Sequence, residues 1–169
     1  MHEGEQTRIF DEWLNRHKAV FFKVVHAYAF TPADRDDLFQ EIATQIWRSI
    51  PKFRGESAVT TWIYRVALYS AIAWSRNERK HKDFTQSNDG IEHAFVETQR
   101  APNPRLAWLY EQIAQLDEID RSLTLMMLDG FSYREMAATL GISENNVGVK
   151  INRIKADLIR KTKKEHHGL

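Results

Sequence analysis

The chain has 169 residues, of which 43% are hydrophobic and 28% are charged, and its formal net charge is +1. This length is enough for one ordinary domain or two small ones, and so weak a net charge does not by itself indicate a nucleic-acid partner. The sequence has no cysteine, which excludes disulfides and thiolate metal sites, and no apolar run approaches the length of a membrane span, so we expect a cytoplasmic protein without membrane insertion.

Helical periodicity dominates the first part of the chain, where strict strand-like alternation is absent. We expect a first helix over about residues 7–29, a second from near Pro32 to just before Pro51, and a third over about residues 59–79. Proline is favoured in the first turn of a helix and disfavours helical geometry in the residue before it, which sets both limits of the second helix. The pattern predicts an all-α fold.

An acidic motif, DRDDLFQE, occupies residues 34–41 of the second expected helix. Helical spacing places Asp34, Asp37 and Glu41 along one side, while Leu38 belongs to a separate apolar stripe. Three interpretations are open: oxygen ligands for a divalent metal, acids matched to the helix dipole, or a face that docks on a basic partner. We favour docking over a metal site because no matching acidic cluster with a base occurs elsewhere.

A loop and an aromatic helix follow the acidic motif. We expect the segment Arg54-Gly55-Glu56-Ser57 to connect two helices. Aromatic and basic residues are then interleaved along the next helix: Trp62, Tyr64, Arg65, Tyr69, Trp74 and Arg76. Rings mixed with arginine suit unstacked single-stranded bases, although aromatics at helical spacing are more often core residues. Trp62, Tyr64 and Tyr69 cannot share one helix face, so we expect some of these rings outside the core.

Periodicity is lost over residues 81–104, which are polar, rich in turn-forming residues and closed by two prolines. We predict a flexible linker here, between two small helical domains over residues 1–80 and 105–169. Two more helices are expected after it, from Pro104 to about Leu116 and from Asp117 to Leu128, with Asp129-Gly130 ending the second of them.

Residues 131–160 indicate a helix-turn-helix with a basic second helix. Met136, Ala137 and Leu140 recur at helical spacing, Gly141 ends the first helix, and Ser143 is the predicted N-cap of the second. The second helix has an apolar stripe that needs a partner helix: Val147, Ile151, Ile154 and Leu158. Its opposite side carries amides and basic groups of the kind that reach base edges and phosphates in a major groove: Asn145, Asn146, Lys150, Asn152, Arg153 and Lys155.

Two segments resemble bacterial RNA polymerase sigma factors of the sigma-70 family, specifically the extracytoplasmic-function group. DRDDLFQEIATQIWRSIPKFRGESAVTTWIYRVA, residues 34–67, is similar to region 2, and residues 109–158 are similar to region 4, with no region 3 between them. The resemblance implies a two-domain, non-enzymatic promoter-recognition subunit without a cofactor. Its implied partners are core RNA polymerase, promoter DNA and an anti-sigma factor.

The resemblance also implies site residues. Region 2 would dock on the β′ clamp helices of core polymerase through Asp34, Asp36, Asp37, Leu38, Gln40 and Glu41. It would recognise and melt the −10 element with a specificity loop and the helix after it: Phe53, Arg54, Gly55, Glu56, Ser57, Trp62, Tyr64, Arg65, Tyr69 and Arg76. Region 4 would hold the polymerase β flap and meet the −35 element through Ser143, Asn145, Asn146, Val149, Lys150, Asn152, Arg153 and Lys155.

The chain departs from the family pattern at three positions. Tyr69 and Ala73 stand where Asn and Asp are common, and Gly148 stands where a basic residue is frequent. The promoter sequences of relatives therefore do not transfer to this chain, and no residue identifies the regulon, the inducing signal or an anti-sigma partner. The alternative function is an autonomous helix-turn-helix regulator that binds duplex without polymerase. A metal-dependent phosphohydrolase is a further alternative, which would use Asp34, Asp37, Glu41 and a histidine such as His26. The sequence lacks the ligand pattern that such an enzyme needs.

Overall fold

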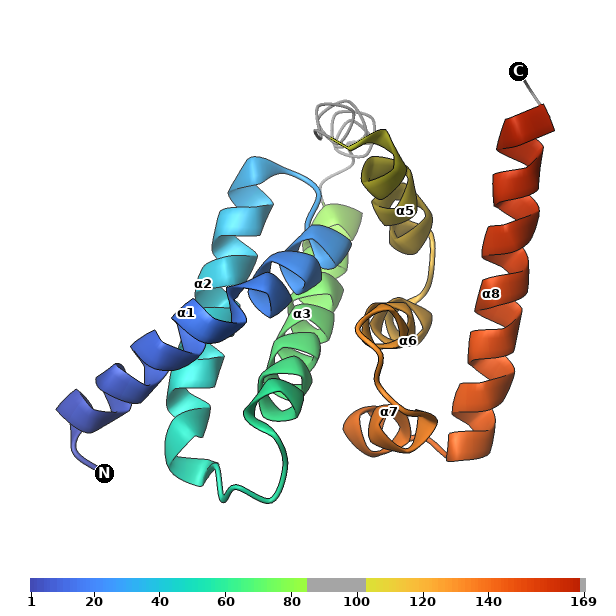
Figure 1. The fold of residues 1–169 in the computed structure, drawn as a ribbon. Helices are drawn as coiled ribbons and strands as arrows, with labels where there is room; N and C mark the ends of the chain where they lie inside the picture. The colour runs from blue at the N-terminus through green and yellow to red at the C-terminus, as the bar shows by residue number, and fades with distance from the viewer. Residues whose placement is uncertain (85–102, 168–169) are drawn as a thin grey trace. The chain divides into compact units, whose positions relative to one another are not determined.

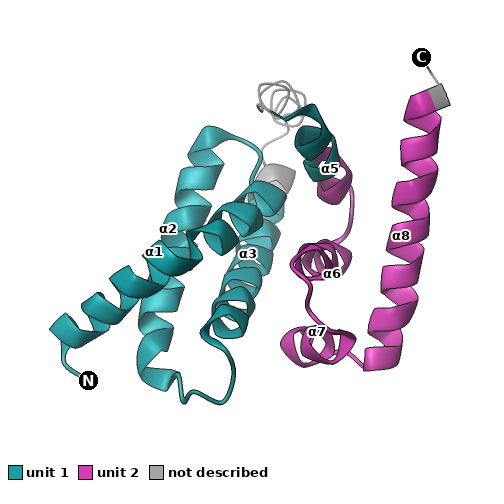
Figure 2. Cartoon of the chain, viewed as in Figure 1, with its two compact units in different colours: residues 1–110 teal, residues 111–169 magenta. Residues whose placement is uncertain are grey.

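The computed structural model describes residues 1–84 and 103–167, and these residues form helices without any strand. The all-α prediction is confirmed for this part of the chain, whereas most of the expected linker lies outside the described residues. Two compact units divide the chain, residues 1–110 and residues 111–169 (Figure 2). Within the described residues, no helix is both long and apolar enough to cross a membrane.

The first unit is built on three helices that pack on one another in every pairwise combination (Figure 1). They are α1 (Glu3–Tyr28), α2 (Pro32–Ser49) and α3 (Val59–Phe84), with a 3₁₀ helix, Ile50–Lys52, after α2. Their shared core contains fully buried side chains from each helix, among them Phe21, Leu38, Ile42, Ile63 and Leu68. Burial of such a side chain contributes about 1.5–3 kcal/mol, which makes this core the main support of the surfaces around it.

The limits of α2 follow from its local sequence, as predicted. The hydroxyl of Thr31 accepts a hydrogen bond from the backbone N–H of Asp34 at 3.1 Å, and Pro32 occupies the first turn. At the other end, Pro51 enters the 3₁₀ helix, and Gly55 reverses the chain with a φ of +71°. The loop that we predicted between the second and third helices is therefore held between two defined helix ends.

The second unit contains α6 (Glu118–Leu128), α7 (Tyr133–Leu140) and α8 (Glu144–His167), while α5 (Pro104–Ala114) spans the division between the units. The three helices of this unit contact one another. Three residues of the predicted apolar stripe of α8, Val147, Ile151 and Ile154, are buried, as are Met126 of α6 and Met136 of α7, whereas the fourth, Leu158, is half-buried. Helix α8 is thus fixed by its apolar side, which leaves its polar side for other contacts.

The turns of the second unit are set by capping side chains and glycine. Asp117 accepts from the backbone N–H of Asp120 at 2.8 Å, and Ser132 and Glu135 form a reciprocal capping box at the start of α7. Gly141 ends α7 with a φ of +68°, and Ser143 then caps α8 by accepting from the N–H of Asn146 at 3.1 Å. The predicted turn at Gly141 and cap at Ser143 are confirmed.

Candidate nucleic-acid interface

The acidic motif forms an exposed row on α2. Asp36, Asp37, Gln40 and Glu41 are exposed, and Asp34 is half-buried at the capped start of the helix. Leu38 is completely buried. The residue that we predicted as a docking contact therefore holds α2 to the core instead of presenting a surface, because its apolar side chain points into the helix packing. Among the described residues, no group of three His, Cys, Asp or Glu side chains is arranged to hold a metal ion.

A groove of about 730 Å³ lies between α2 and α3. Its lining combines basic side chains with aromatic rings: Arg48, Lys52, Arg65, Trp62, Tyr69 and Trp74. Tyr69 keeps 46% of its surface exposed, and Ala73, the second departure from the family pattern, also lines the groove. Rings and cations in one open groove suit unpaired bases joined by phosphates, since a base stacks on a ring and a cation attracts the backbone.

One edge of this groove is fixed by an aromatic chain and a hydrogen bond. Phe53 packs against Trp13 at a ring-centroid distance of 5.3 Å and against Trp62 at 5.5 Å. The indole Nε1 of Trp62 donates to the Ser49 hydroxyl at 3.0 Å. The start of the predicted specificity loop is therefore anchored by Phe53, while the following residues of the loop, Arg54, Gly55, Glu56 and Ser57, are exposed.

The α3 residues of the predicted −10 set fall on two different faces. Arg65, Tyr69 and Arg76 are exposed, but Tyr64 is fully buried, so its ring belongs to the core and is not available on the surface. Sequence spacing contained this distinction, because Tyr64 shares a face with Ala67, Leu68 and Ala71, all of them buried.

Trp74 belongs to the interleaved aromatic residues of the sequence but not to the −10 residues that the resemblance implies, and the structure places it in the groove with Trp62 and Tyr69. On a helical projection Tyr69 lies about 20° from Trp62, whereas Trp74 lies about 140° from Tyr69 and about 80° from the buried Tyr64. Helical periodicity would therefore not have grouped Trp74 with the other two rings, and only the packing of α2 on α3 shows its place in the groove.

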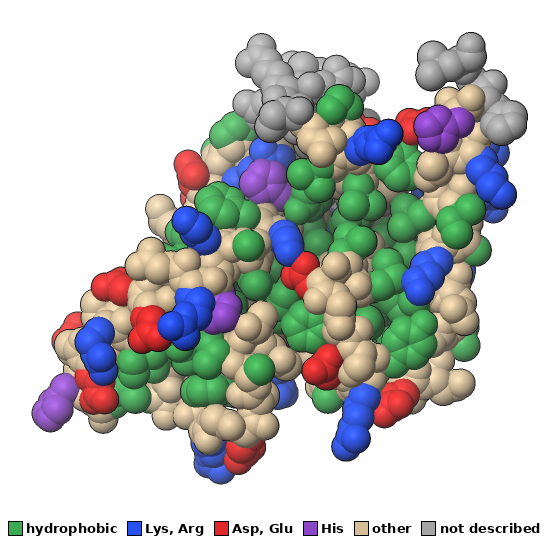
Figure 3. All heavy atoms as spheres, viewed as in Figure 1, with side chains coloured by type: hydrophobic (Ala, Val, Ile, Leu, Met, Phe, Trp, Pro, Cys, Tyr) green, Lys and Arg blue, Asp and Glu red, His purple; other side chains and the backbone are tan. Residues whose placement is uncertain are grey.

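The polar side of α8 is the second candidate surface. Asn145, Asn146, Asn152, Arg153 and Lys155 are exposed, and Val149 exposes 59% of its surface among them. Figure 3 shows lysine and arginine side chains at intervals along this helix. Amides, cations and one apolar group are the side chains that read base edges and thymine methyl groups in a major groove.

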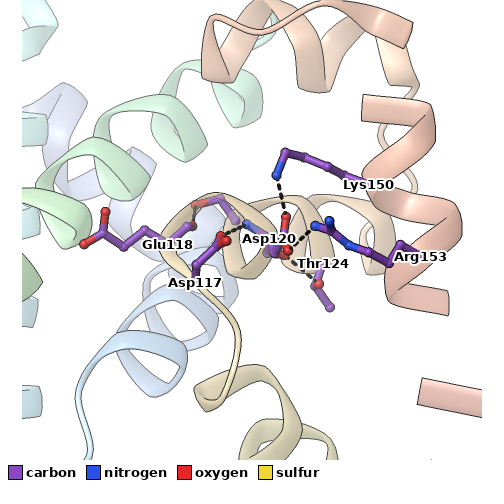
Figure 4. Close-up of polar contacts among 7 residues, drawn as sticks. Asp117, Glu118, Asp120, Thr124, Lys150 and Arg153 are labelled. Carbon is purple, nitrogen blue, oxygen red and sulfur yellow. Dashed lines mark hydrogen bonds and ion pairs between the residues drawn. The ribbon is translucent and has the colours of Figure 1, made fainter. Parts of the chain in front are cut away.

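Two of the predicted cations on α8 are engaged within the protein. Asp120 of α6 receives Lys150 Nζ at 3.2 Å and Arg153 Nη2 at 2.9 Å, one on each carboxylate oxygen (Figure 4). Sequence reasoning missed Asp120, because it lies 30 residues before Lys150 and no local pattern links the two. The contact exists only once α6 and α8 have packed.

Gly148, the third departure from the family pattern, lies under an aromatic ring. A Cβ atom at this position would meet Tyr133 Cε2 at 3.5 Å and Cδ2 at 3.7 Å, which is ordinary van der Waals contact. Tyr133, in the first turn of α7, is 39% exposed. Position 148 thus lacks the basic side chain that is frequent in the family, and the Tyr133 ring of α7 lies beside this position.

Comparison with known families assigns both halves of the chain. The model of "Sigma-70 region 2" matches residues 13–81, and the model of "Sigma-70, region 4" matches residues 106–158. The ECF RNA polymerase sigma-E factor of Escherichia coli strain K12 is 29% identical over 133 residues, which cover 71% of this chain and 69% of that protein. The RNA polymerase sigma factor YlaC of Bacillus subtilis strain 168 is 27% identical over 128 residues, covering 72% and 73%.

Two solved structures share the fold. CnrH in complex with the cytosolic domain of CnrY matches with a TM-score of 0.65 and 21% identity, over 94% of this chain and 90% of that one. The sigma factor RpoE of Bartonella quintana, in complex with the anti-sigma factor NepR, matches with a TM-score of 0.61 and 17% identity, over 90% and 95%.

Proposed function

Since the chain belongs to the sigma-70 family, we propose that it binds core RNA polymerase, recognises −10 and −35 promoter elements and starts transcription of a specific regulon. Its sigma-E relatives carry the name of the extracytoplasmic-function group, and we place this chain in that group. The proposed working place is the cytoplasm, where polymerase and promoter DNA meet. The chemistry of RNA synthesis belongs to the core enzyme, so we assign this chain no catalytic residue and no cofactor.

The groove between α2 and α3 is the observation that carries the proposal. It joins the rings of Trp62, Tyr69 and Trp74 to cations within the region 2 half of the chain. Stacking surfaces serve unpaired bases, whereas a regulator that reads only intact duplex needs none. The groove in the first unit is suited to hold the unpaired strand of an opened promoter segment. The polar side of α8 in the second unit is suited to read a segment that stays paired.

The exposed acidic row of α2 is our candidate for polymerase docking. Asp36, Asp37, Gln40 and Glu41 would meet the β′ clamp helices, because exposed carboxylates attract a basic partner surface and fix its orientation. Asp34 supports the row from the first turn of the helix. Leu38 supports this docking row only indirectly, because its buried side chain holds α2 to the core.

The loop after α2 and the groove beside it are our candidate for −10 recognition. Arg54, Glu56 and Ser57 are exposed in a loop whose start is anchored by the Phe53 ring. A pre-formed loop lowers the entropy cost of holding a flipped base, and the unstacking cost makes the pocket selective. Tyr69 and Trp74 would receive the bases that follow in the opened strand.

The exposed side of α8 is our candidate for −35 recognition, with Asn145, Asn146, Val149, Asn152, Arg153 and Lys155 facing the major groove. Ser143 supports this surface as the helix cap. The apolar surface of the same unit would hold the β flap. Because RpoE of Bartonella quintana is seen with the anti-sigma factor NepR, we also propose that an anti-sigma factor controls this chain.

Run-off transcription with purified core polymerase tests the proposal. The full chain is added to core enzyme on fragments of the genomic DNA of its source, and the start sites are mapped. We expect specific starts that core enzyme alone does not give. Absence of such starts would refute the proposal, and tight binding of the same fragments by the chain without core enzyme would support an autonomous regulator instead.

The docking assignment has its own test. The double variant Asp37→Lys with Glu41→Lys reverses two charges of the exposed row, and we expect at least a tenfold loss of core polymerase binding in a pull-down. Asp11→Lys with Glu12→Lys makes the same charge change on two exposed residues of α1 and serves as the matched control. Equal binding by the two variants would show that the row on α2 is not the docking face.

A further inference from the structure

Asp120 lies where α6 meets the recognition helix. Its side chain is only 9% exposed, and both of its carboxylate oxygens are occupied, one by Lys150 and one by Arg153 of α8. Figure 4 shows the two cations reaching the carboxylate from α8. A buried carboxylate needs compensation for its lost hydration, and two cations supply it here.

The position of Asp120 is fixed by α6 itself. Its backbone N–H donates to the N-cap Asp117 at 2.8 Å, and its backbone carbonyl accepts from the Thr124 hydroxyl at 2.7 Å. Asp120 therefore lies in the first turn of α6, where the positive end of the helix dipole favours an anion. The carboxylate is a rigid reference point for the side chains that reach it.

The two cations are left in different states by this contact. The side chain of Lys150 is only 21% exposed, and its ammonium group is committed to Asp120, whereas 62% of the Arg153 side chain remains exposed. Arg153 uses Nη2 for Asp120, and a guanidinium group carries five N–H donors in a planar fork. Lys150 is thus an internal counter-charge, while Arg153 retains donors for an outside ligand.

We propose that Asp120 is a positioning residue for promoter recognition: it holds Arg153 in the orientation that reads a base pair and withdraws Lys150 from phosphate binding. The inference rests on the proposed function of α8. The inference narrows the set of predicted DNA contacts on α8, because it removes Lys150 from that set and makes Arg153 the main residue that reads a base pair.

Two physical effects make this arrangement useful for specificity. A long, mobile arginine loses rotamer entropy when it binds, and an ion pair made beforehand removes part of that cost. In addition, one negative charge placed between two positive ones reduces the sequence-independent attraction to phosphates. Both effects raise the ratio of specific to non-specific binding, which is the quantity that matters on a genome.

The test uses holoenzyme formed from core polymerase and the full chain, with a duplex library whose −35 segment is randomised. Transcription from the library gives the base preference at each position, and titration at several salt concentrations gives the salt slope of binding. For Asp120→Asn we expect the preference at one or two adjacent base pairs to fall about tenfold. We expect the slope for a non-specific duplex to steepen by about 0.9, the value for one additional neutralised phosphate.

Variants of the two cations separate their roles. Arg153→Lys keeps the charge but removes the planar fork, so it should lose the same base preference as Asp120→Asn. Arg153→Gln should reduce the salt slope, whereas Lys150→Gln should change it little because that charge is already neutralised. Lys164→Gln removes an exposed charge further along α8 and is the control that should leave base preference unchanged.

A purely structural role for Asp120 predicts a different result. The Asn variant would then lower the thermal unfolding temperature and weaken transcription from all library members alike, with an unaltered salt slope and preference, and this would overturn the inference. If Asp120→Asn does not fold, an unchanged base preference in Arg153→Lys would overturn it instead. A wild-type chain that gives no transcripts from the library would refute the proposed function and not this inference.

Discussion

The two candidate DNA surfaces of the chain are built from different side chains and are stabilised in different ways. In the first unit, rings line the groove, and its edge is fixed by aromatic packing among Trp13, Phe53 and Trp62. In the second unit, the exposed side of α8 carries amides and cations, and its position is fixed by caps and by the ion pairs of Asp120.

The difference follows from what each surface would have to recognise. Unpaired bases expose their faces, so rings bind them by stacking with little dependence on sequence. Paired bases expose only their edges, so hydrogen-bonding groups must be held at defined positions in a groove. We therefore expect substitutions in the groove of the first unit to weaken binding of opened DNA, and substitutions on α8 to weaken binding of paired DNA. We also expect the stability of the two units to respond differently to backbone substitutions and to pH.

The largest effect is expected from removing rings of the groove. Stacking contributes about 1–3 kcal/mol per base, so the loss of two rings in Tyr69→Ala with Trp74→Ala should weaken holoenzyme binding to a duplex with an unpaired −10 segment by about thirtyfold or more. Binding to a fully paired fragment that carries only the −35 element should not change. Fluorescence anisotropy with these two probes, taken from promoters mapped by transcription, gives the measurement.

A matched control for the groove exists on α1. Phe22 is an exposed aromatic residue at 55% exposure, outside the groove, and Phe22→Ala should leave both affinities unaltered. The variant Tyr69→Phe should retain most of the affinity for the unpaired probe because it keeps the ring. Equal weakening on both probes by the double variant would mean that the groove is not a single-strand surface.

A smaller effect is expected from two glycines of the helix-turn-helix, with opposite signs. Gly141 has a φ of +68°, so Gly141→Ala should lower the free energy of unfolding by about 1–2 kcal/mol. Gly148 is inside α8, and an added Cβ meets only ordinary contact with Tyr133, so Gly148→Ala should raise that free energy by about 0.5–1 kcal/mol. Urea denaturation followed by circular dichroism at 222 nm compares them.

The same two variants test how the second unit holds α8. Gly141 sets the turn before α8, whereas Gly148 affects only the stability of the helix itself. Stabilisation by both alanines, or loss of stability from both, would contradict the conformations that we assign to these positions. Equal unfolding curves would show that the helix-turn-helix is not part of the observed transition.

Local signals in the sequence located helix limits in both units. Local signals located the limits of α2, the Gly141 turn and the Ser143 cap, because caps and turns depend on residues a few positions apart. The capping box of Ser132 and Glu135 was equally local and was overlooked. Helices were therefore predictable along the described chain, with errors of a few residues at α1 and α3.

The site was less predictable than the fold because exposure depends on packing between helices. Tyr64 and Leu38 belong to motifs that imply contact with a partner, yet the three-helix packing buries both completely. The pairing of Asp120 with Lys150 and Arg153 joins residues 30 and 33 positions apart and needs α6 and α8 in place. A motif identifies which segment acts, but the core decides which of its side chains are available.

The smallest predicted effect concerns pH and again separates the units. Burial lowers the pKa of His26 below its ordinary value of about 6.5, with a further lowering by Arg35 and an opposing effect of the hydrogen bond to the Phe22 carbonyl. Burial, assisted by the neighbouring Arg16, likewise lowers the pKa of His17, which lies at the kink of α1. In the second unit, the pKa of Asp157 is lowered by its hydrogen bond to Lys161 on the exposed surface of α8.

The sign of each effect follows from which state binds more protons. The unfolded chain protonates its histidines near pH 6.5, where His17 and His26 in the folded state still resist protonation, so the free energy of unfolding of the first unit should fall as the pH decreases through that value. Because burial is the main cause, added salt should not remove this dependence. The lowered pKa of Asp157 stabilises the folded second unit only at pH values above the ordinary carboxylate range, and salt screens this effect.

All five tryptophans lie within residues 1–110, at positions 13, 47, 62, 74 and 108, so tryptophan fluorescence during urea denaturation reports the first unit. The double variant His17→Gln with His26→Gln should flatten the profile between pH 7.5 and 5.5, and His2→Gln, at an exposed position, should not; an unaltered profile in the double variant would assign the acid sensitivity to other groups.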